Sequence, residues 1–412
     1  MDELKYLLWL DKIFGSSNRE LWNVLSRHHT SHEAYYAIKD GDYEGMTKSE
    51  IEKAQLVDVA YCEDIIAYCK KNEFNIISYK DDDYPRNLNR LIDKPPVLFC
   101  MGNPGFLNDS VTVTIVGARR PSEYSVRVAN KICSDLASLG IVLISGFAMG
   151  IDSRAHAAAL RNKVPTVAVL GSGLDIDYPK ENTKFKRVIA QKGGAVISEF
   201  FPGTKPNAVN FPIRNRIMAA LGIGTVVVEA SETSGSLKTV GHALDMGRDV
   251  FAVAPADIFD PRYKGNIDLI NDGAEVVLGY GDILKVFLDS YEREIILTNS
   301  KIKLDIDNSK SYKKNELKTK ELKLNEFVYE NQKENSDETE TKANKIENNI
   351  DYSKLDELQT IIVEELKSGD KSINELTDIL SSSYLTSDII ISLTELEMNG
   401  YVQLIQGTKY SL

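Results

Sequence analysis

The sequence predicts an α/β protein with a doubly wound, Rossmann-like parallel sheet, preceded by a small helical domain and followed by a winged-helix domain. Three observations lead to this prediction. Between residues 76 and 295, short apolar runs rich in β-branched residues alternate with helical segments. Residues 1–75 and 354–412 instead show apolar residues at helical spacing, and residues 296–353 are dominated by charge. The 412 residues also exceed the roughly 150 that one domain usually takes.

The composition limits the class of protein. The chain is 42% hydrophobic and 27% charged, values typical of globular proteins with a real core. It contains no apolar run near the roughly 20 residues of a membrane span, and its acidic, amphipathic N-terminus does not resemble a signal peptide. Four cysteines without metal-binding spacing favour a reducing compartment. We therefore expect a cytoplasmic protein without a membrane span, a cofactor or a bound metal.

Residues 1–75 are expected to form several short helices. Leu4, Leu7 and Leu8 share one helical face, and the pattern returns in residues 51–69. His28 and His29 fall near a junction between helices, without carboxylates or thiols at metal-ligand spacing, so we interpret them as solvated side chains.

Residues 76–295 supply the predicted sheet. Near-continuous apolar strands separated by helices indicate a parallel sheet covered on both faces, and right-handed crossovers then give the doubly wound arrangement. The expected strands are Val111–Val116, Ile141–Ile144, Thr166–Leu170, Ala195–Ser198, Thr225–Val228 and Val250–Val253, with Val97–Met101 as a possible addition. The expected helices are Glu123–Leu139, Ile151–Arg161, Thr183–Gln191, Ile213–Leu221 and Gly235–Met246.

Residues 296–353 are predicted to be a charged, flexible linker. Within residues 301–350, 22 side chains are charged and eight are asparagine, with no glycine or proline. Such a segment buries too little apolar surface to offset the entropy lost on ordering. A frayed, charged helix is the alternative.

Residues 354–412 follow the winged-helix order of three helices and a small hairpin. The helix in the recognition position, Thr386–Met398, carries Asp388, Glu395 and Glu397 and has no lysine or arginine. Because phosphate contacts supply most of the DNA affinity of such modules, we favour a protein-contact or regulatory role over DNA reading.

Charge is distributed unevenly along the chain. The net charge is -12, whereas residues 101–250 hold 17 basic and 12 acidic side chains, a net of +5. A basic central segment is compatible with a polyanionic ligand there, although a solvated surface of mixed sign is an equal alternative.

The candidate binding residues follow the predicted strands. Ligands of a doubly wound sheet bind at the carboxyl ends of its strands, and glycine-rich turns at helix N-termini favour phosphate. The basic, glycine and serine residues at these ends predict a site for a phosphate-bearing ligand. They are Gly117, Arg119, Arg120, Ser145, Gly146, Gly171, Lys205, Phe211, Arg214, Arg216, Ser234, Gly235, Ser236 and Lys238.

Other sequence features narrow the class of ligand. Arg119 replaces the second glycine of the dinucleotide motif, and the sequence contains neither a Walker A motif nor a nucleophile elbow. Asp152 and His156 share a helix face and could form an acid–base pair, but we prefer a capping role for Asp152 and a packing role for His156. Phe211 among lysine and arginine side chains is the combination that single-stranded nucleic acid needs; a buried loop phenylalanine is the alternative.

Ordered motifs spread over about 200 residues resemble the DprA/Smf DNA-processing family. They are Gly117-Ala118-Arg119-Arg120-Pro121, Ser145-Gly146 with Gly150-Ile151-Asp152 and Ala155-His156, Leu170-Gly171 with Gly173 and Tyr178-Pro179, Phe211-Pro212 with Arg214-Asn215-Arg216, and Ser234-Gly235-Ser236. Asp83-Tyr84-Pro85, Pro95-Pro96-Val97-Leu98, Gly265-Asn266 and Leu269-Ile270 with Gly273-Ala274 fit as well. The flanks resemble a sterile-alpha-motif domain and a winged helix more loosely.

The resemblance implies a bacterial single-stranded DNA-binding recombination mediator without a catalytic centre. Such a protein dimerises, protects incoming DNA and helps load the RecA recombinase during natural transformation. Gly117 and Arg119 match the family's phosphate-contacting turn, and Lys205 and Phe211 lie in the loop where the family uses a lysine and an aromatic residue. Residues 254–256, Lys238 and the long linker depart from the family pattern.

Two other functions remain open from the sequence. Nucleotide-monophosphate phosphoribohydrolases share the architecture, but their proline-glycine-glycine-x-glycine-threonine turn is missing from residues 232–236. The third possibility is an adaptor that binds a regulatory nucleotide in the same pocket.

Overall fold

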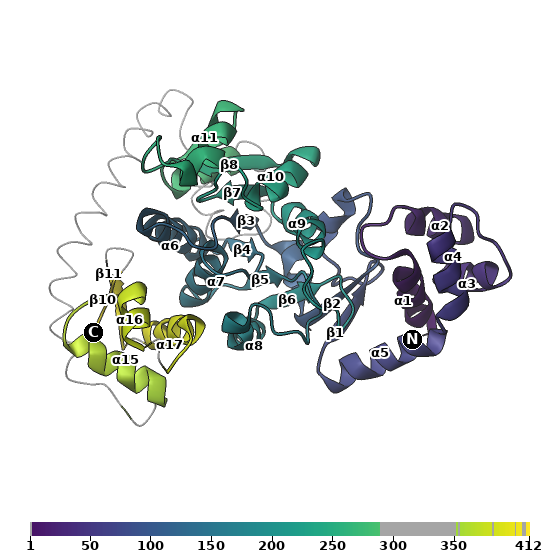
Figure 1. Cartoon of the computed structure of the whole chain (residues 1–412), viewed down its shortest axis with the longest axis horizontal. Helices are drawn as coiled ribbons and strands as arrows, with labels where there is room; N and C mark the ends of the chain where they lie inside the picture. The colour runs from purple at the N-terminus through teal and green to yellow at the C-terminus, as the bar shows by residue number, and fades with distance from the viewer. Residues whose placement is uncertain (1, 289–351, 353–354, 381–382, 400, 406–408) are drawn as a thin grey trace, which may run out of the picture.

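The structure is a computed structural model that describes residues 2–288, 352, 355–380, 383–399, 401–405 and 409–412 (Figure 1). Of the linker predicted over residues 296–353, only Tyr352 lies among the described residues, so the linker stays a prediction. None of the helices in the described part of the chain is long and apolar enough to cross a membrane.

Five helices precede the sheet, as the sequence predicts for residues 1–75. Trp9 is fully buried among them, and its indole Nε1 donates to the Val57 carbonyl over 2.8 Å. Thr47 and Glu50 form a capping box that fixes the start of the fourth helix. The helices are α1 (Asp2–Phe14), α2 (Glu20–His28), α3 (Ser31–Lys39), α4 (Lys48–Leu56) and α5 (Val59–Lys71).

A nine-stranded sheet forms the centre of the molecule, in the order β1-β2-β6-β5-β4-β3-β7-β8-β9. The strands are β1 (Asn75–Ser78), β2 (Val97–Gly102), β3 (Thr112–Val116), β4 (Val142–Ser145), β5 (Thr166–Val169), β6 (Ala195–Ser198), β7 (Gly224–Val227), β8 (Asp249–Val253) and β9 (Glu275–Val277). The seven strands from β3 to β9 pair in parallel. Strands β1 and β2 run antiparallel along one edge, so the sheet is mixed rather than wholly parallel.

Helices cover both faces of the sheet. In Figure 1, α6 (Glu123–Ser138), α7 (Ile151–Arg161) and α8 (Thr183–Gln191) lie on one side of it. The opposite side carries α9 (Asn210–Leu221), α10 (Ser236–Asp245) and α11 (Lys264–Asn271). The strands β3 to β7 are buried along their whole length, which explains why they are apolar without alternation. Short 3₁₀ turns complete this region: η1 (Arg86–Arg90), η2 (Pro104–Asp109), η3 (Lys180–Asn182) and η4 (Pro261–Tyr263).

The chain begins α9 earlier than the sequence predicts. The expected loop over residues 199–212 ends at Asn210, so Phe211 lies in the first turn of a helix rather than in a loop. From Arg214 to Leu221 every residue of α9 is buried. Cations near the start of this helix are therefore surrounded by protein.

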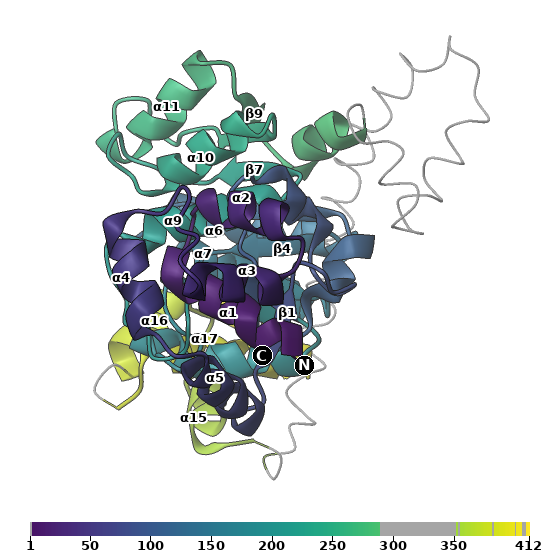
Figure 2. The same cartoon turned by 90° about the vertical axis from the view of Figure 1, so that its right-hand side faces the viewer.

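Among the described residues from 355 onward, the chain forms three helices and a three-stranded antiparallel sheet, here called the C-terminal domain. Its elements are α15 (Glu357–Lys367), β10 (Lys371–Ser372), α16 (Ile373–Leu380), α17 (Thr386–Met398), β11 (Gln403–Ile405) and β12 (Lys409–Ser411). Helix α17 packs against α7, α8 and η3 of the central part. Figure 1 shows the two ends of the chain on opposite sides of the sheet, and in Figure 2 the helices α15 to α17 lie below α6 and α7.

Candidate nucleic-acid interface

The turn after β3 is the centre of the candidate site. Gly117 follows β3 directly, and a Cβ added there would lie 2.7 Å from Cγ1 of Ile151, the first residue of α7. The Ile151 N–H donates to the Ala118 carbonyl over 3.2 Å. Gly150 has a φ of 81°, and its Cβ would approach the Ala118 carbonyl oxygen to 2.4 Å. Glycine is therefore required at both positions for the turn to pack on the start of α7.

A hydrogen-bond network fixes the far end of this turn. The Ser122 N–H and hydroxyl both donate to Glu229 Oε2, over 2.9 and 2.7 Å, and the hydroxyl also lies 2.6 Å from the Tyr263 hydroxyl. Ser122 caps α6 by accepting from the Ser125 N–H. Because both ends of the turn are held, Arg119 is presented from a rigid backbone and its side chain is exposed.

The turn after β7 is joined to the same place. The Ser236 hydroxyl donates to the Gly117 carbonyl over 3.1 Å, and Ser234 Oγ accepts from the Ser236 N–H. Gly235 is exposed, and its carbonyl accepts from Asn215 Nδ2 over 3.4 Å. The predicted Ser234–Ser236 turn therefore adjoins the Gly117 turn at the carboxyl edge of the sheet.

Phe211 occupies the middle of the cluster. Its ring lies against Gly171, where an added Cβ would be 2.9 Å from Cδ1 of the ring. The guanidinium of Arg119 lies 5.8 Å from the ring centroid, and that of Arg214 lies 6.0 Å from it. Distances of this size are those of cation–π contacts. The partly exposed Phe211 thus connects the turns that follow β3, β5 and β6.

The loop that carries Lys205 is tied to the turn after β5. The Gly203 N–H donates to both carboxylate oxygens of Asp175, over 2.8 and 3.0 Å, and the Gly173 N–H donates to the Thr204 carbonyl. Lys205 is exposed beside these anchored residues. Arg120 and Lys238 are exposed as well, the former in the Gly117 turn and the latter in α10.

Arg214 has a different role from the one predicted. It is 5% exposed, and its Nη1 donates to the carbonyls of Gly146 (2.5 Å) and Val169. Burial lowers the pKa of Arg214 to about 10. Its guanidinium supports Phe211 from within the protein instead of facing a ligand.

Arg216 must be removed from the predicted site. It is 3% exposed, and its guanidinium lies 2.7 Å from Glu199 Oε2 and 3.3 Å from Asp93 Oδ2. The Arg216 guanidinium is thus ion-paired to two carboxylates inside the protein and is unavailable to a phosphate. Ser145 is likewise internal, because its buried hydroxyl donates to the Ile115 carbonyl over 2.7 Å. The buried Gly146 contributes only the close approach of Arg214 and Asp152.

Asp152 and His156 are buried beneath the cluster. Asp152 Oδ2 accepts from the Ala148 N–H, while Gly150 is the N-cap of α7, so Asp152 fixes the preceding loop rather than capping the helix. Burial raises the pKa of Asp152 and lowers that of the fully buried His156 to about 3. His156 Nδ1 lies 2.8 Å from Thr166 Oγ1. A neutral, enclosed imidazole is poorly suited to exchange protons with a ligand.

Sequence reasoning missed the contribution of Tyr178 to this cluster. Its ring centroid lies 5.7 Å from that of Phe211, and the residue is 37% exposed. The one indication in the sequence was that Tyr178 follows the third predicted strand, Thr166–Leu170, at the edge of the sheet where ligands bind. The two rings give the site an aromatic floor beside the exposed cations. Within the described ranges, no group of three histidine, cysteine, aspartate or glutamate residues is arranged to hold a metal ion.

Known proteins resemble this part of the chain. The sequence profile described as DNA recombination-mediator protein A matches residues 75–288. The DNA processing protein DprA of Streptococcus pneumoniae (strain ATCC BAA-255 / R6) is 41% identical over 215 residues, covering 52% of this chain and 75% of that protein. Its counterpart in Bacillus subtilis (strain 168) is 38% identical over 221 residues, covering 54% and 74%.

A solved structure agrees with these sequence matches. The X-ray structure of DNA processing protein A from Streptococcus pneumoniae is 34% identical, with a TM-score of 0.58, and covers 68% of this chain and 97% of that one. The matched profile spans more than half of the 412 residues and includes every strand of the nine-stranded sheet. This chain belongs to the DNA recombination-mediator protein A family, the DprA/Smf proteins.

Proposed function

We propose that the chain binds single-stranded DNA at the carboxyl edge of its sheet and acts as a recombination mediator in DNA processing during natural transformation. The observation that carries this proposal is the position of Phe211, a partly exposed ring between the guanidiniums of Arg119 and Arg214. A base can stack on the ring or on its neighbour Tyr178, while exposed cations contact the phosphates on either side. Family membership and the names of the relatives support the same function.

The proposed contacts divide into two groups. Arg119, Arg120, Lys205 and Lys238 are exposed and supply positive charge for phosphate oxygens. The backbone of Gly117 and of the exposed Gly235 allows close approach of a phosphate, whereas Gly171 lies beneath Phe211 and acts by seating its ring. Arg214 acts as a positioning residue, because it supports the aromatic ring from below.

We further propose that the protein works in the cytoplasm without catalysing a reaction, as a homodimer that protects incoming DNA and helps to load RecA. The helices α1 to α5 and the elements α15 to β12 are proposed to be sterile-alpha-motif-like and winged-helix domains. Burial of Asp152 and His156 supports binding without turnover. Incubation with nucleoside monophosphates tests this part: we expect no free base by chromatography, and its release would favour the phosphoribohydrolase alternative.

The substitution Phe211→Leu tests the binding site. It keeps an apolar side chain against Gly171 but removes the stacking surface, so we expect the affinity for a short oligothymidylate to fall by about 1–3 kcal/mol, or about 5- to 150-fold. Phe211→Tyr should retain most of the affinity. The assay is fluorescence anisotropy with labelled single strands and with duplex of the same length. Equal binding of Phe211→Leu and the unaltered protein would remove Phe211 from the interface.

A further inference from the structure

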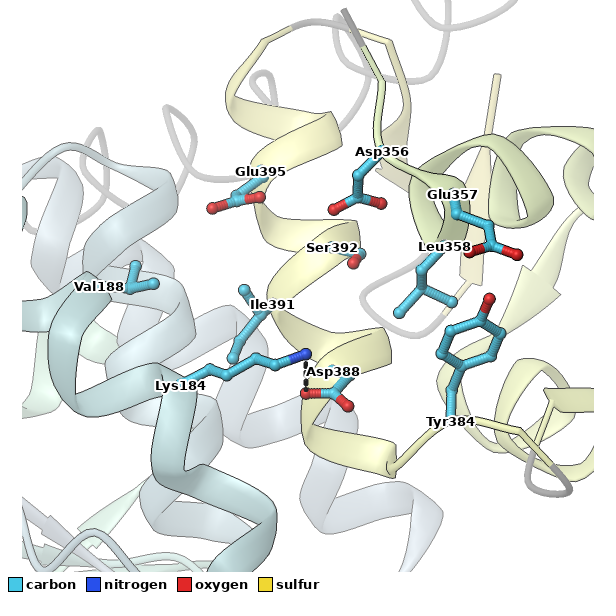
Figure 3. Close-up of a pocket in the computed structure, with 10 residues that line it drawn as sticks. All are labelled: Lys184, Val188, Asp356, Glu357, Leu358, Tyr384, Asp388, Ile391, Ser392 and Glu395. Carbon is cyan, nitrogen blue, oxygen red and sulfur yellow. Dashed lines mark ion pairs between the residues drawn. The ribbon is translucent and has the colours of Figure 1, made fainter. Parts of the chain in front are cut away.

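Helix α17 is turned toward the central part of the protein rather than toward solvent. It packs on α7, α8 and η3, and the ammonium of Lys184 in α8 lies 3.2 Å from Asp388 Oδ1 in α17 (Figure 3). The Glu395 carboxylate lies close enough to Lys192 for that cation to oppose the burial-driven rise in the pKa of Glu395. The acidic face of α17 is therefore matched to cations of α8.

Two arginines of α7 lie under the C-terminal domain. The Arg161 side chain is 7% exposed; its Nε lies 3.5 Å from Glu397 Oε2 and its Nη1 donates to the Tyr410 hydroxyl over 3.1 Å. Its Nη2 is buried without a hydrogen-bond partner among the described residues. Arg154, two helical turns earlier, is also buried, and burial lowers its pKa to about 10, with Arg161 acting in the same direction. The contact therefore buries two guanidiniums beside one carboxylate, that of Glu397, and leaves the Nη2 donor of Arg161 without an acceptor in the described part of the chain.

A cleft interrupts the contact between α8 and the C-terminal domain. It has a volume of ≈ 390 Å³, lies between α8 on one side and α15 and α17 on the other, and is open to solvent beside the exposed Asp356 and Glu357 (Figure 3). Ile391 of α17 points toward α8, and four carboxylates also line the cleft. The ion pair between Lys184 and Asp388 at this cleft is partly exposed, and such pairs contribute only about 0–1 kcal/mol. We therefore expect the contact to open at modest cost.

The cations that face α17 lie next to the candidate DNA site. Tyr178, whose ring contacts Phe211, is followed by Pro179 and then by η3, which leads directly into α8. Asn182 at the end of η3 donates to the Phe147 carbonyl over 3.0 Å, which anchors η3 to the loop after β4. Because α17 also packs on η3, the C-terminal domain adjoins the rim of the aromatic cluster.

We propose that the buried side chains of Arg154 and Arg161, together with the exposed Lys184 and Lys192, form a second phosphate-binding surface, here called the α17-facing basic face; α17 occludes the two arginines and opposes the two lysines with its carboxylates. When the C-terminal domain leaves, a single strand seated on Phe211 continues over η3 and onto this face. Acidic α17 and nucleic acid therefore compete for the same cations, and the C-terminal domain controls how many nucleotides the protein engages. This inference rests on the proposed single-strand binding at the strand ends.

The chemistry of the face favours phosphate as its second occupant. Guanidinium groups bind phosphate oxygens through paired N–H donors, and such an oxygen would satisfy the donor of Arg161 that lacks a partner in the docked state. Helix α17 supplies Asp388, Glu395 and Glu397 to the cations and has no basic residue of its own. Helix α17 is therefore suited to pair with these cations in place of a nucleic acid, and not to bind a nucleic acid itself.

Ile391→Asp in the full chain tests the proposal. The new carboxylate faces α8 and should release the domain, while adding no positive charge to α17. Ile379→Asp in α16 is the matched control, because Ile379 is 45% exposed. Amide hydrogen exchange in residues 151–161 and 386–398 reports release, and anisotropy with oligothymidylates of about 6 and about 25 nucleotides reports binding. The double variant Asp388→Asn with Glu397→Gln gives a second, milder route to release.

The released variants should bind the longer strand more tightly, with a salt slope steeper by about 2–3, because two buried guanidiniums become uncovered and two exposed lysines lose the carboxylates that oppose them. Binding of the short strand should not change. Adding Lys184→Ala and Lys192→Ala to Ile391→Asp should cancel about half of the gain in slope. The proposal is overturned by an unchanged slope in variants whose α7 exchanges faster, by a gain confined to duplex DNA, or by unaltered exchange in both released variants. Failure of the short strand to bind any version would instead refute the proposed function.

Discussion

Replacing Arg119 by alanine should remove one phosphate contact without disturbing the fold. Its side chain is exposed, and the turn that carries it is held by backbone and serine contacts instead. Each phosphate contact to a single strand contributes about 0.7 to the slope of log K against log salt. Four exposed cations, Arg119, Arg120, Lys205 and Lys238, then give a total slope of about -3, and Arg119→Ala should reduce it to about -2. At 0.1 M salt, the lost contact corresponds to about fivefold weaker binding.

Anisotropy titrations of a short oligothymidylate between 0.05 and about 0.3 M salt measure this slope. Arg90→Ala is the matched control, because Arg90 is exposed but lies away from the site. It belongs to η1, and η1 contacts α9 at its last residue, through Asn87, rather than at the first turn that carries Phe211. It changes the net charge equally and should leave the slope unaltered. A slope that is the same in Arg119→Ala and the unaltered protein, or that falls equally in Arg90→Ala, would refute the assignment of Arg119 to phosphate.

Three further predictions concern the protein around the site. Arg216→Ala should lower the free energy of unfolding by about 3–5 kcal/mol in urea denaturation, because it leaves a buried glutamate unpaired, and a loss below 1 kcal/mol would contradict this. Gly171→Ala should displace Phe211 and weaken single-strand binding in the anisotropy assay, whereas Gly241→Ala in α10, with nothing within 4 Å of its new methyl group, should bind normally. The pKa of Asp11 is raised well above 3.8, chiefly by burial. As the pH rises above about 4, the unfolded state therefore loses a proton from Asp11 that the folded state retains. Stability should therefore fall with rising pH until the folded-state pKa is passed, and Asp11→Asn should flatten urea-derived stability profiles between about pH 4 and 8; parallel profiles would contradict the assignment.

The central sheet could be predicted from the sequence because strands buried on both faces are apolar throughout. The six expected strands appear as β3 to β8, and α7 and α8 have the predicted bounds. The antiparallel pair β1 and β2 could not be oriented in this way, since burial gives the same apolar run for either direction. Strand β9 has three residues, of which Glu275 and Val276 are exposed, so it carries too little apolar signal to be found.

The candidate binding residues fall into two groups, according to whether their surroundings can be inferred from the sequence. Glycines after strands have a local cause, the close approach of backbone and helix, and Gly117 and Gly171 lie where predicted. Arginines have the same sequence signal whether they face solvent or a buried carboxylate. Arg214 and Arg216 belong to a helix that is buried from Arg214 to Leu221. The apolar residues that follow them in the sequence indicated that this helix is buried. Ion pairs formed over long sequence separations, such as that of Arg216, depend on the complete fold.

Helix α7 contacts both the Gly117 turn and the C-terminal domain. Ile151 supports the Gly117 turn at its start, Arg161 meets the C-terminal domain at its end, and the ten residues from Ile151 to Leu160 are buried. A fluorophore or spin label attached to α7 would thus have no room and would disturb both ends at once. Reporters of domain position belong instead on α8, where Arg187 and Gln191 are exposed, and distance measurements from there can follow the C-terminal domain without touching the helix that both regions share.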